Sequence, residues 1–294
     1  MMGLGKNIHE WSDYQFRCSG LSNILAGAKN APITEKQTVR LNELMDKVKL
    51  TEKQAEERTT LVSKLYAPKY SISTLSGGAK TYLKQLWIEV TYDRRKVIST
   101  KQMTKGTEEE CTALQMANRV LGWGLDVDYI NGLEFYKNRM YNEYLSGETD
   151  LDEDVVLADV KCPWNIHTFP FFDVEIPTDA YFWQGQGYMA LTGKEEFELV
   201  YCLVDTPERL ILDEIRKVEW QKGMMEISDE ESDAIRKEMT FGDIPEEHRV
   251  RRWKFQIDKD AQKAIVDAVK LARKYLRELD EQFLVNMNHN PKQI

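Results

Sequence analysis

The sequence predicts an α/β fold in which a central mixed β-sheet is flanked by helices and preceded by a helical N-terminal part. Three observations predict it. Residues 156–161 (VLADVK) alternate between two faces as a strand does, and 197–204 (FELVYCLV) have the continuous apolar character of a buried strand. Residues 261–283 repeat apolar side chains at helical spacing, which is typical of a helix packed on a core.

No linker in the sequence requires a domain boundary, so we expect a single domain over residues 1–294. Within it, residues 1–104 are expected to be mainly helical and residues 105–205 to form the core. Residues 206–294 are expected to supply a last strand and a long helix.

The N-terminal part is expected to contain two short helices within residues 33–66. Each begins with a Thr-x-x-Gln capping box, first at Thr34 and Gln37 and again at Thr51 and Gln54. In this pattern two side chains satisfy backbone N–H groups that have no partner at a helix start.

The remaining elements are expected in the following order: a helix over 79–91 after Ser76-Gly77-Gly78, a helix over 107–120, paired strands within 127–143, a connection over 172–177, a helix over 178–191, surface helices within 205–248, a strand over 250–257 and a frayed tail over 286–294.

Composition excludes several classes of protein. No apolar run approaches the roughly 18–20 residues that span a bilayer, and the N-terminal residues do not resemble a signal peptide, so we expect no membrane partner and a cytoplasmic location. Four cysteines without CxxC spacing and four scattered histidines argue against a zinc site. A metal in this protein would therefore have oxygen ligands, which favour Mg²⁺ or Mn²⁺.

Charge is distributed unevenly along the chain. Residues 1–106 carry 18 Lys and Arg against 10 Asp and Glu, whereas the remainder carries 22 against 39. The most basic stretch is 80–105. Binding of a polyanion depends on such local patches rather than on the formal net charge of −9. A solvated helix face is an equally good interpretation of this stretch.

The stretch GETDLDEDVVLADVKCPW at 147–164 carries the candidate chemistry. Strand alternation places Asp159 and Lys161 on one face, and a turn after Asp150 would bring its carboxylate towards Asp159. Two close carboxylates repel each other unless a cation lies between them. The alternative is an ordinary surface ion pair, because Asp-x-Lys is a common pattern.

These residues resemble the motifs of the PD-(D/E)XK nuclease superfamily. Gly147 and Asp150 match its Gly-x-x-Asp, Asp159 and Lys161 match its Asp-x-Lys, and a helix follows with Gln-x-x-x-Tyr. The helix segment YFWQGQGYMALTG is similar to that of the phage exonuclease and YqaJ-type recombinase branch, which includes lambda exonuclease. Gly106 and Glu110 match a further Gly-x-x-x-Glu of this branch. The superfamily's proline is absent, because Thr149 precedes Asp150.

The resemblance implies a restriction-endonuclease-like core and assigns roles to residues. Mg²⁺, or Mn²⁺, would be held by Asp150, Asp159, Glu110 and the carbonyl group of Val160. Lys161 would orient the attacking water or stabilise developing charge, and Gln184 would lie near the metal. Tyr188, Ser19 and Arg17 would contact DNA. The choice of Glu110 rests on its spacing from Gly106, with Glu109 in reserve and Glu108 also adjacent.

The resemblance further implies a DNA exonuclease that acts on double-stranded ends in phage-type recombination inside a bacterial host cell. It also implies a single-strand annealing protein as partner and a homo-oligomeric, trimeric ring. Three alternatives remain open: a structure-specific or defence endonuclease on the same fold, a catalytically idle DNA-binding relative, and an interaction module that matches the motifs by accident. Trp164, Phe169 and Phe171 would either stack on a base or belong to the core.

Overall fold

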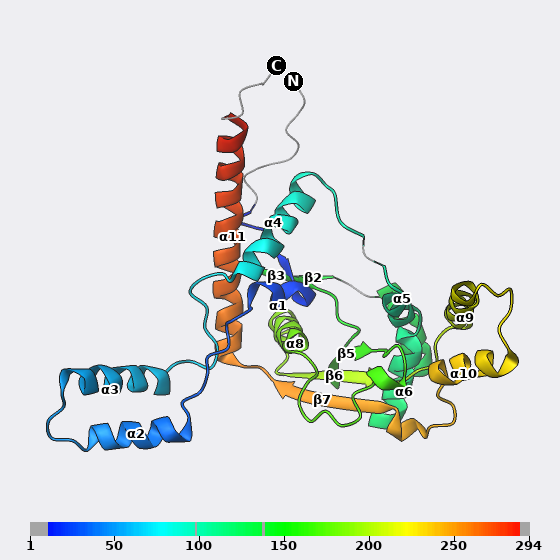
Figure 1. Ribbon diagram of the computed structural model, residues 1–294, viewed down its shortest axis with the longest axis horizontal. Coiled ribbons are helices and arrows are strands. Elements are labelled where there is room, and N and C mark those ends of the chain that lie inside the picture. Colours follow the sequence, from blue (N-terminus) through cyan, green and yellow to red (C-terminus); the bar gives the residue numbers. More distant parts are fainter. Residues whose placement is uncertain (1–10, 98, 137–138, 289–294) are drawn as a thin grey trace. The chain divides into compact units, whose positions relative to one another are not determined.

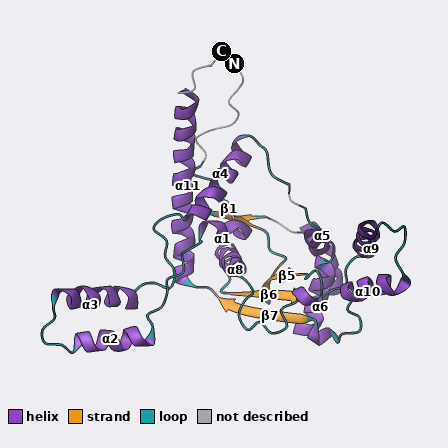
Figure 2. Cartoon of the chain, viewed as in Figure 1, coloured by secondary structure: helices purple, strands orange, loops and turns teal. Residues whose placement is uncertain are grey.

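The computed structural model describes residues 11–97, 99–136 and 139–288. These residues form two compact units. The first contains 11–14, Leu21–Asp93 and 258–288, and the second contains Gln15–Gly20 and Arg94–Ile257. Helices flank a mixed β-sheet in the second unit, which confirms the predicted α/β class (Figure 2). The single domain over residues 1–294 stays a prediction.

Three helices contribute to the core of the first unit. Helix α1 (Leu21–Ile24), helix α4 (Gly77–Thr91) and helix α11 (Lys259–Asn288) pack together (Figure 1). The Trp87 indole N–H donates a hydrogen bond to Asp280 Oδ1 at 2.6 Å, and its ring lies 5.1 Å from that of Phe283. The predicted helices over 79–91 and 261–283 are therefore confirmed.

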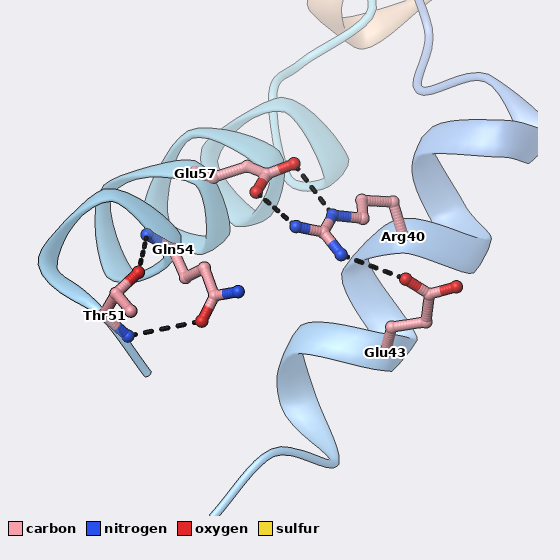
Figure 3. Close-up of polar contacts among 5 residues, drawn as sticks. All are labelled: Arg40, Glu43, Thr51, Gln54 and Glu57. Atoms are coloured by element: carbon pink, nitrogen blue, oxygen red, sulfur yellow. Dashed lines mark hydrogen bonds and ion pairs between the residues drawn. The ribbon is translucent and has the colours of Figure 1, made fainter. Parts of the chain in front are cut away.

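The two predicted short helices form a hairpin in the first unit, α2 (Glu35–Met45) and α3 (Glu52–Leu65) (Figure 1). Both capping boxes are formed as the sequence predicts. Arg40 binds both carboxylate oxygens of Glu57 and also pairs with Glu43 (Figure 3). A small apolar cluster around Leu44 lies between the helices, so the hairpin has a core of its own.

The second unit is organised around a four-stranded sheet of order β4-β5-β6-β7. Its strands are β4 (Leu151–Glu153), β5 (Val156–Lys161), β6 (Glu196–Cys202) and β7 (Val250–Gln256). Strands β5 and β6 are parallel, whereas the β4–β5 and β6–β7 pairs are antiparallel. A smaller sheet contains β1 (Phe16–Arg17), β3 (Leu145–Gly147) and β2 (Met140–Tyr141).

A different helix packs on each face of the larger sheet. Helix α6 (Glu110–Leu121) packs on the face that carries Val156, Ala158 and Val160. Helix α8 (Asp179–Thr192) contacts Asp159 and Lys161 on the other face, so the predicted alternation along β5 is confirmed. Gly185 of α8 is needed for this packing, because a Cβ there would lie 2.6 Å from Phe255 and 2.7 Å from Phe197.

The prediction of paired strands within 127–143 is wrong for most of that segment, which forms helix α7 (Val127–Tyr136) before the short strand β2. Asp126 caps the helix by accepting a hydrogen bond from the Tyr129 N–H at 3.0 Å. Ile130 and Leu133 are buried three positions apart and pack with α6. Helical spacing of these two side chains thus prevails over the strand propensity of the aromatic residues.

The predicted helix over 107–120 is divided. Helix α5 (Lys101–Glu108) ends at Glu108, and α6 begins at Glu110, so Glu109 separates the two helices. The surface helices expected within 205–248 are present as α9 (Glu208–Lys222) and α10 (Asp229–Met239). Short 3-10 turns occur at Cys18–Gly20 (η1), Ile166–Thr168 (η2) and Glu246–His248 (η3).

The predicted connection over 172–177 contains neither helix nor strand. Helix α11 continues to Asn288, and the rest of the expected frayed tail, 289–294, lies outside the described residues. Among the helices that the structure describes, none is both long enough and apolar enough to cross a membrane.

Candidate active site

Strand β5 places an acid and a lysine side by side. Asp159 is almost completely buried, and its Oδ2 atom forms an ion pair with the Lys161 ammonium group. Lys161 keeps 26% of its side-chain surface exposed, so the pair is accessible from one side.

The β4–β5 hairpin brings Asp150 to the same place. Leu151 of β4 is paired with Ala158 of β5, so the preceding residue, Asp150, lies next to Asp159 across the hairpin. Asp150 Oδ2 accepts a hydrogen bond from the Val160 N–H at 2.8 Å. The predicted approach of Asp150 to Asp159 is thus observed, but the turn expected over 151–154 lies at Asp154 and Val155, because residues 151–153 form strand β4.

Helix α8 packs on the face of the sheet that carries Asp159 and Lys161 and contributes a hydrogen bond to Asp159. The Gln184 amide donates to Asp159 Oδ1 at 3.3 Å and to the Tyr188 hydroxyl oxygen at 2.9 Å. Tyr188 in turn donates to the Glu148 carbonyl oxygen at 2.8 Å, in the segment that leads to Asp150. The predicted shared face of Gln184 and Tyr188 is therefore observed. Tyr188 is buried, and its hydroxyl group donates to a backbone carbonyl group. Its contact with DNA stays a prediction.

A cleft of about 620 Å³ opens beside these residues. Its lining joins α5 and α6 to the end of β5 and to the start of α8. The lining includes Gln102, Gly106, Thr107, Glu110, Asp150, Val160, Lys161, Cys162, Trp164, Thr168, Tyr181 and Tyr201.

The three consecutive glutamates take different positions. Glu110, the first residue of α6, lines the cleft, as the spacing from Gly106 predicts. Glu108 instead forms an ion pair with Arg209 of α9. Glu109 occupies the break between the two helices. Glu110 is thus the member of the run that shares the cleft with Asp150.

The carboxylates influence one another electrostatically. Burial, the charge of Asp150 and, more weakly, that of Glu110 raise the pKa of Asp159 to about 7, while Lys161 opposes them. Burial lowers the pKa of Lys161, but Asp159 and Asp150 outweigh it, so the net pKa shift of Lys161 is upward. The arrangement holds negative charge that a nearby cation would stabilise.

These residues fit a hard divalent cation. Asp159 contributes a buried carboxylate, and Asp150 and the Val160 backbone lie beside it. No three Asp, Glu, His or Cys side chains are gathered closely enough to form a metal site by themselves in the described part of the chain. Mg²⁺ commonly takes one or two carboxylates and completes its shell with water, so two acids suffice. Glu110 as a direct ligand stays a prediction.

The N-terminal residues assigned to DNA lie beside the segment that carries Asp150. Arg17 is paired with Ser146 in the small sheet, and Ser19 follows in η1. Both side chains are exposed. The Cys18 sulfur approaches Gly147 so closely that a Cβ on Gly147 would lie 3.0 Å from it. Their contact with DNA stays a prediction.

The three aromatic residues that follow β5, Trp164, Phe169 and Phe171, pack against apolar clusters. Phe169 is buried in an apolar cluster that also includes Phe171, and their rings lie 4.7 Å apart. Trp164 packs against a second cluster formed with α9 and α10, although it also lines the cleft. The core interpretation of these residues is favoured.

Sequence reasoning missed two aromatic residues of the cleft, Tyr181 and Tyr201. Tyr181 lies three positions before Gln184, so extending the helical spacing backwards along α8 would have found it. Tyr201 carries no local signal, because its place depends on the pairing of β6 with β5.

No family model matches this chain, and no curated protein does. Among solved structures it is similar to a phage related exonuclease from Haemophilus somnus 129PT, with a TM-score of 0.59, 20% identity, and coverage of 94% of this chain and 100% of that one. An alkaline exonuclease from Laribacter hongkongensis aligns with a TM-score of 0.46, 12% identity and coverage of 95% and 97%. The same enzyme in complex with dAMP aligns with a TM-score of 0.41, 15% identity and coverage of 85% and 90%. The chain therefore shares the fold of the Haemophilus somnus structure.

Proposed function

We propose that this protein is a metal-dependent DNA exonuclease that hydrolyses phosphodiester bonds at DNA ends. The observation that carries the proposal is one open cleft lined by Asp150, Lys161 and Glu110, with the buried Asp159 paired to Lys161 beside it. The motif order in the sequence and the shared fold with the Haemophilus somnus phage related exonuclease support it.

We assign a different role in hydrolysis to each side chain of the site. Asp150, Asp159 and the Val160 carbonyl would hold Mg²⁺ or Mn²⁺, with help from Glu110, which lines the same cleft. When bound, such an ion polarises a phosphate and lowers the pKa of a coordinated water. Lys161 would orient the attacking water or stabilise charge that develops on the phosphate. Gln184 keeps the Asp159 carboxylate in its orientation through the hydrogen bond to Oδ1.

An electrostatic asymmetry supports a polyanionic substrate. The candidate catalytic site is acidic, whereas residues 80–105 carry several exposed cations, among them Lys84, Arg94 and Lys96. Phosphate backbones bind to such cations without regard to base sequence. Arg17 would add a further contact near the DNA end.

The test is degradation of end-labelled linear DNA beside a closed circle, with Mg²⁺ or EDTA. Wild type is compared with Lys161→Ala and with the matched control Lys217→Ala, whose lysine is exposed on α9. Mg²⁺-dependent loss of linear DNA alone, abolished only by Lys161→Ala, supports the exonuclease. Nicking of the circle indicates the endonuclease instead. Binding of DNA without cleavage of either substrate indicates an idle relative.

The resemblance to the phage exonuclease branch adds a biological context to the proposal. It includes action in phage-type recombination beside a single-strand annealing protein, assembly into a homo-oligomeric ring, and a cytoplasmic location. Light scattering on purified protein would test the ring, since a trimer has three times the chain mass of 34.3 kDa.

A further inference from the structure

Helix α8 presents one continuous face to strand β5. Tyr181, Gln184 and Tyr188 are spaced i, i+3 and i+7, so they lie in line along the helix. Gln184 contacts Asp159, and Tyr181 contacts Lys161. Helix α8 therefore contacts both members of the Asp159–Lys161 pair, each through a different side chain.

Tyr181 lies in the first turn of α8, where the backbone is well held. The Thr178 hydroxyl caps the helix by accepting a hydrogen bond from the Ala180 N–H at 3.3 Å. The Tyr181 N–H donates to the Thr178 carbonyl at 3.1 Å. The Tyr181 ring lines the cleft, and its centroid lies 5.3 Å from the Lys161 ammonium nitrogen.

A second aromatic residue packs against Tyr181. The rings of Tyr181 and Tyr201 lie 6.2 Å apart in an edge-to-face arrangement, and Tyr201 packs in the same manner against Trp253 at 5.7 Å. Tyr201 is also the partner of Lys161 in the parallel β5–β6 ladder. The ring of Tyr181 thus packs against β6, the strand that pairs with the lysine's own strand β5.

A lysine needs such support to act at a defined point. Its four-carbon side chain has many rotamers, and one ion pair fixes the ammonium group on one side only. A ring within about 6 Å attracts the cation by its quadrupole, and the attraction grows where water is displaced. Asp159 and Tyr181 together hold the Lys161 ammonium group between a carboxylate and an aromatic ring.

We propose that Tyr181 is a positioning residue for the hydrolytic reaction, because its ring holds the Lys161 ammonium group at the cleft through a cation–π contact. The inference rests on the proposed nuclease function and deepens it. The hydroxyl group of Tyr181 is not part of this role, so a phenylalanine replaces the residue adequately whereas an aliphatic side chain does not.

The experiment measures kcat and KM of Mg²⁺-dependent cleavage of linear DNA for wild type, Tyr181→Phe and Tyr181→Leu, with Lys161→Ala as the inactive reference. We expect Tyr181→Phe to stay within about twofold of wild type and Tyr181→Leu to lose about tenfold in kcat with KM nearly unchanged. Fluorinated phenylalanines at position 181 keep the shape of the ring while weakening its quadrupole. They should lower kcat progressively with fluorine number.

The outcomes separate this inference from the function on which it rests. If wild type cuts DNA and Lys161→Ala does not, but Tyr181→Leu equals wild type, the positioning role alone is wrong. A raised KM at unchanged kcat would mean that the ring contacts DNA instead, which also overturns the role. A kcat that is insensitive to fluorination would exclude the cation–π contact. If wild type cuts no DNA at all, both proposals fail together.

Discussion

The side-chain amide of Gln184 donates a hydrogen bond to Asp159 Oδ1 at 3.3 Å, although 25 residues separate them in the sequence. The same amide binds the Tyr188 hydroxyl, which donates to the Glu148 carbonyl. One chain of hydrogen bonds thus joins the middle of α8 to β5 and to the segment before Asp150. Of the carboxylates of the site, Asp159 takes part in this chain, through its Oδ1 atom.

Replacing Gln184 with leucine removes both hydrogen bonds at nearly constant volume. Because a buried hydrogen bond to a charged group contributes about 1.5–3 kcal/mol, kcat for DNA cleavage should fall at least about tenfold. Steady-state cleavage of linear DNA measures it. Gln282→Leu, at an exposed position of α11, serves as the matched control and should retain wild-type activity. An unchanged kcat in Gln184→Leu would show that Asp159 needs no such orientation.

Mg²⁺ should raise the melting temperature of the wild-type protein. A ligand that binds only the folded state stabilises it by about 2.7 kcal/mol at a concentration 100 times its Kd, which corresponds to at least about 3 °C. Asp150→Asn and Asp159→Asn should abolish this shift, whereas Asp233→Asn on the exposed part of α10 should retain it. Thermal melting with and without Mg²⁺ measures the effect without reference to activity. Equal shifts in all four proteins would place the ion elsewhere.

Gly185→Ala should destabilise the fold. Its new Cβ would lie 2.6 Å from Phe255 and 2.7 Å from Phe197, so α8 must move away from the sheet, at a cost of about 1–3 kcal/mol. Gly106→Ala is the matched control, because a Cβ at that helical position meets nothing within 4 Å. The second variant should gain about 0.5–1 kcal/mol from helix propensity. Urea unfolding of both variants compares them. A neutral Gly185→Ala would contradict the close packing of α8.

Lys105 should make stability depend on pH. Its side chain is fully buried, and burial lowers its pKa from 10.5 to about 8, with Cys162, Glu109 and Asp205 opposing the shift. Below pH 8 both folded and unfolded states hold the proton, and the folded state carries the full penalty of a buried charge. Between pH 8 and 10.5 the unfolded state binds more protons. Stability therefore rises with pH across that window, by about 3 kcal/mol.

Lys105→Met should remove this contribution. It should be more stable than wild type at pH 7, by less than the full penalty because the hydrogen bond to the Trp164 carbonyl at 3.3 Å is lost as well. The difference between the two proteins should shrink or reverse by pH 10. Urea unfolding at several pH values tests this. Parallel pH curves for the two proteins would mean that the buried lysine keeps an ordinary pKa.

Local patterns account for a large part of the fold. The two capping boxes at Thr34 and Thr51 form as predicted, because a cap involves only residues three apart. The alternation along β5 likewise follows from backbone geometry, so the spacing of Asp159 and Lys161 suffices to place them on one face. The error over 127–136 arose where aromatic composition and helical spacing disagreed and burial against α6 decided between them.

The sequence by itself determined which residues are candidates for the chemistry, because the spacings of Asp150, Asp159, Lys161, Gln184 and Tyr188 are local properties of a turn, a strand and a helix. Only the tertiary structure decided how they meet. Strand register brought Asp150 beside Asp159, the break at Glu109 and the pairing of Glu108 with Arg209 left Glu110 in the cleft, and helix packing set the Tyr181 ring against Lys161. Such contacts join residues far apart in the chain, and their geometry depends on the packing of whole elements, which no local pattern encodes.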